Sequence, residues 1–383
     1  MIEDIKNFKT NWIDGMKISK ENFQNLQDYA ESSVKDLTSL QMSKDGYGLI
    51  SSHLSDTNEY SITIDAHQSL KISIKKLRAI TPNGTRVEIS NKTPAVTEDV
   101  VVEEFSNNKL EEGFVLLNVD PENSVAFGEQ DPKEIPPRYP FITHSYFFTF
   151  INTTELYKSG LGGHQIPIAK IVRENNALTI ATEYITPVTS LETNEALIDF
   201  YNVTEAFLKM AERSSILIAQ KINTKQSDNP IADAMHIVVD KLFAYLSQQI
   251  TFVKWEEYQM HPKKLLEIIV SFSRLFKSAA DVSSPENKEQ LFNYFGEWTD
   301  LKGGDYEKIF TNIINMNYNH IDINENLVIV NSFISIIDRL FTVLTQVDYI
   351  GKRRDMGIFV NENIVQEKSG TTGKSGGHSF LAD

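Results

Sequence analysis

Few residue patterns in this sequence come close to the spacing that ligand binding or catalysis requires. The nearest is Gly373-Lys374-Ser375, which has the end of a phosphate-binding loop. That loop needs a glycine five positions before Gly373, where Lys368 stands, and it needs a following helix whose amide groups hold the phosphate. Only eight residues follow Ser375, so the sequence predicts no nucleotide site here.

A second pattern resembles the start of a calcium-binding loop. Asp322, Asn324 and Asn326 occupy the first three ligand positions at the right spacing. Leu327 then replaces the glycine that the loop needs for its turn. Phe333 replaces the glutamate that binds the ion with both oxygens. The sequence therefore predicts no calcium site.

The remaining polar residues form no catalytic or metal-binding pattern either. The eight histidines have none of the spacings of a zinc site, the chain has no cysteine, and no Gly-x-Ser-x-Gly motif occurs. Paired carboxylates such as Glu103-Glu104 and Glu111-Glu112 are more typical of a solvated surface than of acid–base catalysis. We predict no enzyme, no catalytic residue, no metal and no cofactor, although a site assembled from distant residues would leave no such pattern.

Composition places the chain among soluble globular proteins. Of its 383 residues 41% are hydrophobic and 23% are charged, and this length predicts two or three domains. The net charge of −15 opposes binding to nucleic acid or to an anionic membrane. The acidic residues 1–6 lack the apolar run of a signal peptide, and no stretch of about 18 apolar residues predicts a membrane span. We expect a cytoplasmic protein.

The first half of the chain has the period of two that is typical of strands. Apolar and polar residues alternate over 60–64 and 70–74, and a tight turn is predicted at Pro82-Asn83-Gly84-Thr85. Four prolines over 132–140 predict an extended loop, and residues 19–40 predict a helix. Further strands are expected over 113–119, 145–151, 166–172 and 178–184. These elements predict an N-terminal β-sandwich or open barrel, which we place at residues 1–187 as a shell domain.

From Pro187 onward the apolar spacing changes to three and four, which is typical of helices. Long helices are expected over about 197–217, after Asn229-Pro230, after His261-Pro262 and over about 325–346, with shorter ones over 285–317. They predict an antiparallel four-helix bundle at 188–350, and hence an α+β multidomain chain. Polar, glycine-rich residues 351–383 predict a tail or an arm ordered by a partner.

The last long helix is apolar around most of its circumference. Such a helix is enclosed by several neighbours, either inside a large bundle or between copies of the chain. We favour self-association. The residues predicted to form the oligomer interface are Phe333, Ile337, Leu340, Phe341 and Leu344.

The segment 12–24, WIDGMKISKENFQ, resembles the opening signature of the TssK baseplate proteins of type VI secretion systems, roughly W-x-[DE]-G-M-x-L-x-P-x-H-F-Q. The matching residues are Trp12, Asp14, Gly15, Met16, Phe23 and Gln24, with Ile18 nearly equivalent. Lys20 and Asn22 depart from the proline and the histidine of that signature. As a local structure, the segment predicts an aromatic anchor, a glycine turn and a helix that begins after Ser19.

Later segments resemble the same family and keep its order along the chain. They are GYGL at 46–49, Ile64-Asp65 with Leu70 and PNGT at 82–85, IPIAKI at 166–171, HP with two leucines at 261–266, and YNH at 318–320. Each is short, and their order from residue 12 to residue 320 makes the resemblance more specific.

The resemblance implies a β-sandwich shell like the shoulder domain of phage receptor-binding proteins, followed by a helical bundle that trimerises. In the family, the N-terminal domain binds the wedge proteins TssF and TssG, and a further C-terminal domain reaches the inner-membrane complex of TssL and TssM. We expect a baseplate adaptor at the inner face of the inner membrane. The wedge-interface residues expected from the matching segment are Trp12, Gly15, Met16 and Phe23.

The chain departs from the family pattern at its C-terminal end. Only 37 residues follow the last long helix, too few for that further globular domain. The tail, or a substitute anchor, would therefore make the membrane-side contact. An alternative function is a phage-tail-like module that binds a receptor or a carbohydrate through its β domain.

Overall fold

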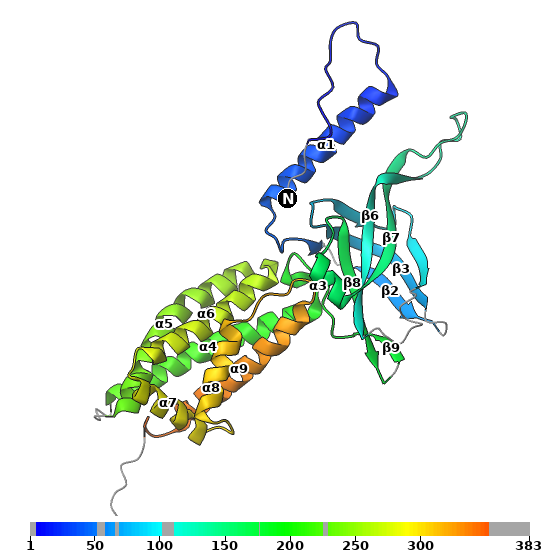
Figure 1. Cartoon of the computed structure of the whole chain (residues 1–383). Coiled ribbons are helices and arrows are strands. Elements are labelled where there is room, and N and C mark those ends of the chain that lie inside the picture. Colours follow the sequence, from blue (N-terminus) through cyan, green and yellow to red (C-terminus); the bar gives the residue numbers. More distant parts are fainter. Residues whose placement is uncertain are drawn as a thin grey trace, which may run out of the picture.

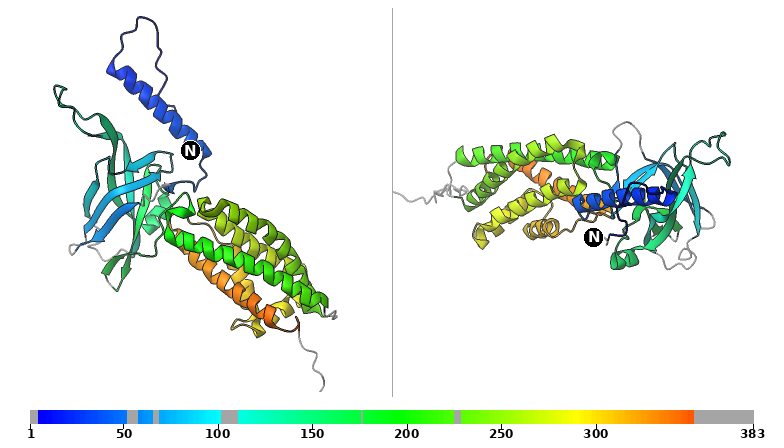
Figure 2. Two further views of the ribbon diagram at one scale, coloured as in Figure 1. Left: turned by 180° about the vertical axis from the view of Figure 1, so that it is seen from behind. Right: turned by 90° about the horizontal axis from the view of Figure 1, so that it is seen from above.

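The computed structural model of the chain describes residues 5–51, 58–65, 69–101, 111–175, 177–224 and 229–351. Along the chain follow an arm built around helix α1 (Lys20–Gln41), a region of antiparallel strands, and a helical bundle (Figure 1). The arm stands clear of the strands and the bundle except at the C-terminal end of α1, both in Figure 1 and in the view from behind in Figure 2. This order of elements confirms the predicted α+β fold class.

The strands form two antiparallel sheets. The first contains β1 (Gly48–Leu49), β2 (Glu59–Ile64), β3 (Ser69–Ile80), β4 (Arg86–Ile89) and β5 (Val96–Val101), all except β3 itself paired with β3. The second has the order β7 (Phe141–Asn152), β6 (Glu112–Phe127), β8 (Gln165–Glu174) and β9 (Ala177–Ile180). Buried side chains of both sheets, such as Ile72 and Leu117, belong to one apolar core, as expected of the predicted sandwich.

Turn chemistry fixes the hairpin between β3 and β4 as predicted. Gly84 has a φ of +85°, a conformation that residues with a Cβ rarely adopt. The proline-rich segment 132–140 forms part of the loop between β6 and β7.

Two strands differ in length from their predictions. The last one ends at Ile180 as β9 and does not reach residue 184. Strand β6 continues to Phe127, because β7 pairs with it beyond Asn118, where β8 stops. The outer parts of β6 and β7 therefore form a two-stranded ribbon that projects from the sheet (Figure 1).

The helical half contains six α-helices in the described residues. They are α4 (Glu195–Thr224), α5 (Pro230–Glu256), α6 (Pro262–Asp281), α7 (Pro285–Glu297), α8 (Gly303–Ile314) and α9 (Ile323–Gln346). Asn229 caps α5 by accepting a hydrogen bond from the amide of Ile231, with Pro230 in the first turn. The four long helices and the shorter pair between the third and fourth are as predicted.

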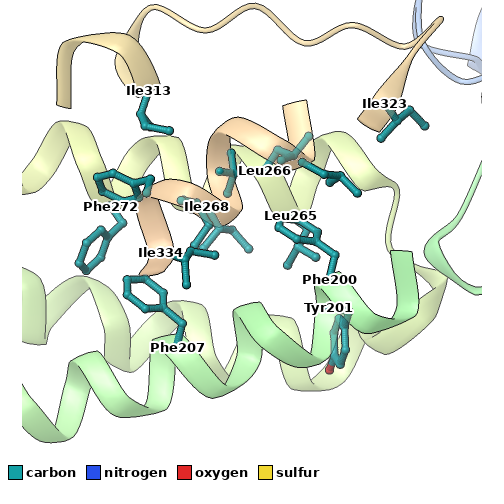
Figure 3. Close-up of a cluster of buried hydrophobic side chains, with 14 of the residues drawn as sticks. Phe200, Tyr201, Phe207, Leu265, Leu266, Ile268, Phe272, Ile313, Ile323 and Ile334 are labelled. Atoms are coloured by element: carbon teal, nitrogen blue, oxygen red, sulfur yellow. The ribbon is translucent and has the colours of Figure 1, made fainter. Parts of the chain in front are cut away.

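Aromatic side chains fill the centre of the bundle. The Phe276 ring lies 4.7 Å from the ring of Phe310, and the Phe207 ring of α4 lies 5.3 Å from that of Phe272 on α6. Figure 3 shows Phe207 and Phe272 pointing into the same core as Ile334 of α9. Burial of such large apolar side chains is the main favourable term in the free energy of folding.

The structure corrects the assignment of the α9 residues to an oligomer interface. Each of them is at most 1% exposed in the single chain: Phe333, Ile337, Leu340, Phe341 and Leu344. Helix α9 contacts α4, α6 and α8, so its wide apolar arc is explained by a central position in one bundle. Self-association stays a prediction, and it must use other side chains.

Helix α9 is also the one described helix that is long and apolar enough to cross a membrane. Length and composition alone do not distinguish a membrane span from the core helix of a globular bundle. The apolar side chains of α9 pack against neighbouring helices of the same chain, and this favours a core helix.

Candidate functional site

The N-terminal arm is a hairpin in which residues 5–12 run back along α1. Ser19 begins the helix, because its amide and its hydroxyl both donate to the side-chain oxygen of Asn22, at 2.9 and 3.0 Å. Asn22 departs from the family's histidine, and this capping contact gives it a local role. Farther along, the Asn7 side chain donates to the Ser32 hydroxyl at 2.7 Å and joins the two segments.

The four predicted wedge-interface residues lie at the tip of this arm. Gly15 has a φ of +79° in a turn closed by a hydrogen bond from the Met16 amide to the Ile13 carbonyl, 3.2 Å long. The rings of Trp12 and Phe23 lie 6.4 Å apart, and their side chains are 45% and 57% exposed. They therefore do not fill the core of the sandwich, and they present an aromatic surface to solvent.

Helix α1 contacts its own strand region through polar residues. The Ser39 hydroxyl donates to the Asn83 carbonyl at 2.7 Å, in the turn between β3 and β4. A Cβ added to Gly84 would lie 2.9 Å from the Lys35 carbonyl, so glycine allows the turn to approach α1 closely. None of the residues of α1 is buried. The PNGT turn thus supports the arm.

The end of the chain that leads from α1 to β1, together with β1 itself, forms the root of the arm, which we define as residues 45–49. The Leu49 amide donates to the Pro187 carbonyl at 2.8 Å, and the Thr189 amide donates to the Leu49 carbonyl at 3.0 Å. Gly48 has a φ of +119°, and a Cβ there would lie 2.2 Å from the Pro187 oxygen. The root is therefore in backbone contact with the segment that connects the strands to the bundle.

His261, at the start of α6, binds the root from the bundle side. Its Nδ1 accepts from the Lys263 amide at 3.1 Å, so the proton lies on Nε2, which donates to the Asp45 carbonyl at 2.8 Å. The Lys263 ammonium lies 2.6 Å from the Asp45 carboxylate. The His261 side chain thus caps α6 and also holds the arm root.

His320, in the loop before α9, makes a parallel contact. The Tyr318 hydroxyl donates to its Nδ1 at 2.8 Å, and its Nε2 donates to the Tyr47 carbonyl at 2.8 Å. The rings of His261 and His320 stack with centroids 5.4 Å apart. Burial lowers the pKa of His261 and lowers that of His320 to about 4, so both imidazoles are neutral at pH 7.

A cluster of charged side chains joins β8 to the start of α9. The Lys170 ammonium lies 2.9 Å from Asp322 and 3.3 Å from both Glu112 and Glu325. Burial opposes its charge, but the hydrogen bond to Asp322 and the three carboxylates raise the pKa of Lys170 above its ordinary value. The lysine therefore stays charged and ties the strands to the bundle.

Sequence reasoning did not assign a role to Lys170, to His261 or to His320. The sequence signal that could have pointed to the two histidines is the set of short segments that carry the resemblance, since both lie in such segments. Residues 46–49, 261–262 and 318–320 all meet at the arm root. In the part of the chain that the structure describes, no group of histidine, aspartate and glutamate side chains is placed to hold a metal ion.

Comparison with known proteins places this fold in a class. No family model matches the sequence, and no curated protein matches it. Among solved structures, the chain is similar to those of the baseplate of type VI secretion systems, including one that contains TssK. At 11–12% sequence identity, this similarity shows the fold alone.

Two of these structures match over nearly their whole length. One is the TssK-TssF-TssG baseplate subcomplex of the type VI secretion system, with 11% identity, a TM-score of 0.51, and coverage of 88% of this chain and 100% of that chain. The other is the baseplate complex from the type VI secretion system, with 12% identity, a TM-score of 0.50, and coverage of 86% and 100%. The chain therefore has a TssK-like fold.

Proposed function

We propose that the chain is a structural, non-enzymatic baseplate subunit of a type VI secretion system. In this role it is a cytoplasmic, homotrimeric adaptor. It links the wedge proteins to a complex that anchors the baseplate to the membrane. The observation that supports this most strongly is the extent of the fold similarity, which covers 86–88% of this chain and all of the two matched chains. Three of the ordered sequence segments, at 46–49, 261–262 and 318–320, meet at the arm root and support it independently.

Within this function, residues 1–187 form the shell domain that contacts the wedge proteins, and the arm tip is the contact surface. An exposed aromatic pair beside a turn is the kind of anchor that dominates protein interfaces. Trp12 and Phe23 form such a pair, with Gly15 and Met16 in the adjoining turn.

Residues 188–350 form the bundle domain, whose far end is proposed to face the membrane side. The described chain ends just after α9, at the end of the bundle opposite the strands (Figure 1). The proposed tail contact with a membrane complex or a substitute anchor belongs to residues 352–383, which lie outside the described residues.

Co-expression with the TssF and TssG proteins of the same organism tests the proposal. The full chain should co-purify with both. Trp12→Ser should weaken that binding at least tenfold, because an aromatic anchor typically contributes about 2 kcal/mol or more. Trp255→Ser is the matched control, because Trp255 is 81% exposed on α5, outside the arm, and its loss should leave binding unchanged.

Two results would contradict the proposal. A chain that does not co-purify with TssF or TssG, and that gives clear hits on a glycan array, would favour the carbohydrate-binding alternative. A stable monomer in light scattering at micromolar concentration would contradict the homotrimer.

A further inference from the structure

Two parts of the chain, the arm and the ribbon of β6 and β7, project from the molecule on narrow bases. The arm is attached at the C-terminal end of α1. The ribbon consists of residues 119–127 and 141–146, and it begins where the pairing of β6 with β8 ends at Asn118. Both extend away from the bundle in Figure 1 and in the view from behind in Figure 2. The contacts at the two bases therefore decide where the projections point.

Asn83, in the turn between β3 and β4, contacts the base of the arm on one side. The Ser39 hydroxyl donates to its carbonyl at 2.7 Å, and the Lys35 ammonium lies 3.2 Å from its side-chain oxygen. On the other side, the Asn83 amide donates to the Gly163 carbonyl at 3.0 Å, and a ring nitrogen of His164 lies 2.9 Å from the same side-chain oxygen. With this orientation of the side chain, its nitrogen donates to the Gly163 carbonyl at 2.9 Å.

The loop on the far side of this turn is attached to β6 at the base of the ribbon. The His164 carbonyl accepts from the Val119 amide at 3.0 Å. The Gln165 side chain donates to the Asn118 side-chain oxygen at 3.0 Å, and Asn118 donates to the Thr149 hydroxyl of β7 at 3.0 Å. Asn118 is 4% exposed, so its amide is held by protein partners on both sides. A continuous run of polar contacts thus leads to both strands from which the ribbon extends.

Glycines permit the close approach of these segments, and polar contacts hold it. A Cβ added to Gly163 would lie 3.2 Å from the Cβ of Asn83. No residue of α1 is buried, and its apolar Leu40 faces outward with 65% exposure. The C-terminal end of α1 is therefore held against the strand region by the contacts at Asn83.

We infer that Asn83 is a positioning residue that holds the arm and the ribbon in one relative orientation. Residues 42–44 join α1 to the arm root without a buried side chain, so on their own they would let the helix swing about the root. The attachment at Asn83 is a second fixed point, and two fixed points define a direction. A partner of the arm then meets a surface that is already ordered, and ordering it during binding costs no further free energy.

Hydrogen exchange of the full chain tests this inference without any partner. Asn83→Ala should accelerate exchange at least about tenfold in the second half of α1 and in the ribbon, and leave the bundle unchanged. Asn83 is not at a positive φ, so alanine fits the turn and the chain should fold. Acceleration throughout the chain, or in the arm without the ribbon, would overturn the inference.

Two further variants serve as controls. Thr93→Ala removes a hydroxyl that accepts from the Ser90 amide at 2.8 Å, in the turn at the other end of β4, and should leave both projections unchanged. Asn83→Asp keeps an oxygen towards Lys35 and His164 and suits a turn. It should therefore accelerate exchange in the arm less than Asn83→Ala does, and equal acceleration would argue against these contacts.

The consequence for wedge binding rests on the proposed function. Asn83→Ala leaves every residue of the arm tip in place, so a loss of at least about threefold in binding to TssF and TssG would come from lost positioning. If binding is unchanged while exchange in the arm accelerates, wedge binding does not use the positioning. If the unaltered chain binds neither protein, the proposed function fails, whereas the exchange experiment still decides the role of Asn83.

Discussion

At the scale of single residues, the stacked histidines at the arm root must stay neutral to keep their contacts. Each ring donates one hydrogen bond to a root carbonyl and accepts one at Nδ1, which a protonated ring cannot do. His320 is 4% exposed, and a positive charge there would also face His261 and Lys263. The root is therefore expected to weaken when the pH falls.

The folded-state pKa of His320, about 4, lies below its ordinary value of 6.5. The unfolded chain thus binds more protons between these values, and stability falls as the pH falls through this range. This pKa shift corresponds to a contribution on the order of 3 kcal/mol to the free energy of unfolding at neutral pH. Urea unfolding of the unaltered chain and of His320→Gln at pH 7, 6, 5 and 4 measures this contribution. Because the same carboxylates titrate in both proteins, their effect cancels in the difference between the two free energies of unfolding. That difference should shrink towards pH 4. A constant difference would contradict the assignment.

Removing the imidazole altogether should be costly at neutral pH. His320→Leu leaves the Tyr47 carbonyl and the Tyr318 hydroxyl without their partner in a buried place, which costs about 1–3 kcal/mol in the free energy of unfolding. His236→Leu on α5 is the control, with an expected change within about 0.5 kcal/mol, since His236 is half-buried outside the root. Denaturant unfolding at pH 7 compares them, and equal losses would argue against a role for the root contacts.

At the scale of elements, the sequence predicts well what depends on neighbouring residues. The start of α5 at Asn229-Pro230 and the turn at Gly84 follow from local chemistry, and both are found. The face that a helix buries depends on distant partners. For that reason the apolar arc of α9 could not be assigned to the core, and the outward side of α1 could not be foreseen.

Strand β1 offers a test of how closely the root and the connecting segment must approach. Gly48→Ala would combine a positive φ with a Cβ 2.2 Å from the Pro187 oxygen, so the backbone must shift. We expect a loss of more than about 2 kcal/mol in the free energy of unfolding. Gly304→Ala in α8 meets nothing within 4 Å and should be neutral or stabilising by up to about 1 kcal/mol. Thermal unfolding distinguishes them, and similar melting temperatures would contradict the close packing at β1.

At the scale of the whole molecule, the strands and the bundle are joined by contacts between residues far apart in sequence. The hydrogen bond from His320 to Tyr47 spans 273 positions, and that from Lys170 to Asp322 spans 152. Local sequence patterns carry no information about such distant pairs. The sequence could therefore indicate which segments matter, but not that they contact one another. The first contact joins the arm root to the bundle, and the second joins strand β8 to the start of α9.

Lys170 is a charged group at this junction that pairs with three carboxylates. Its side chain is 12% exposed and that of Asp322 is 5% exposed, so Lys170→Met would leave a buried carboxylate without its cation. Breaking such a pair costs about 3 kcal/mol, and Lys241→Met, in a pair that is mostly exposed, should cost less than about 1 kcal/mol. Limited proteolysis of the connecting segment 185–191, together with urea unfolding, measures both effects. Adding Asp322→Asn to Lys170→Met should recover part of the loss, because the neutral amide needs no cation. If the double variant is no more stable than Lys170→Met alone, the ion pair does not hold the junction.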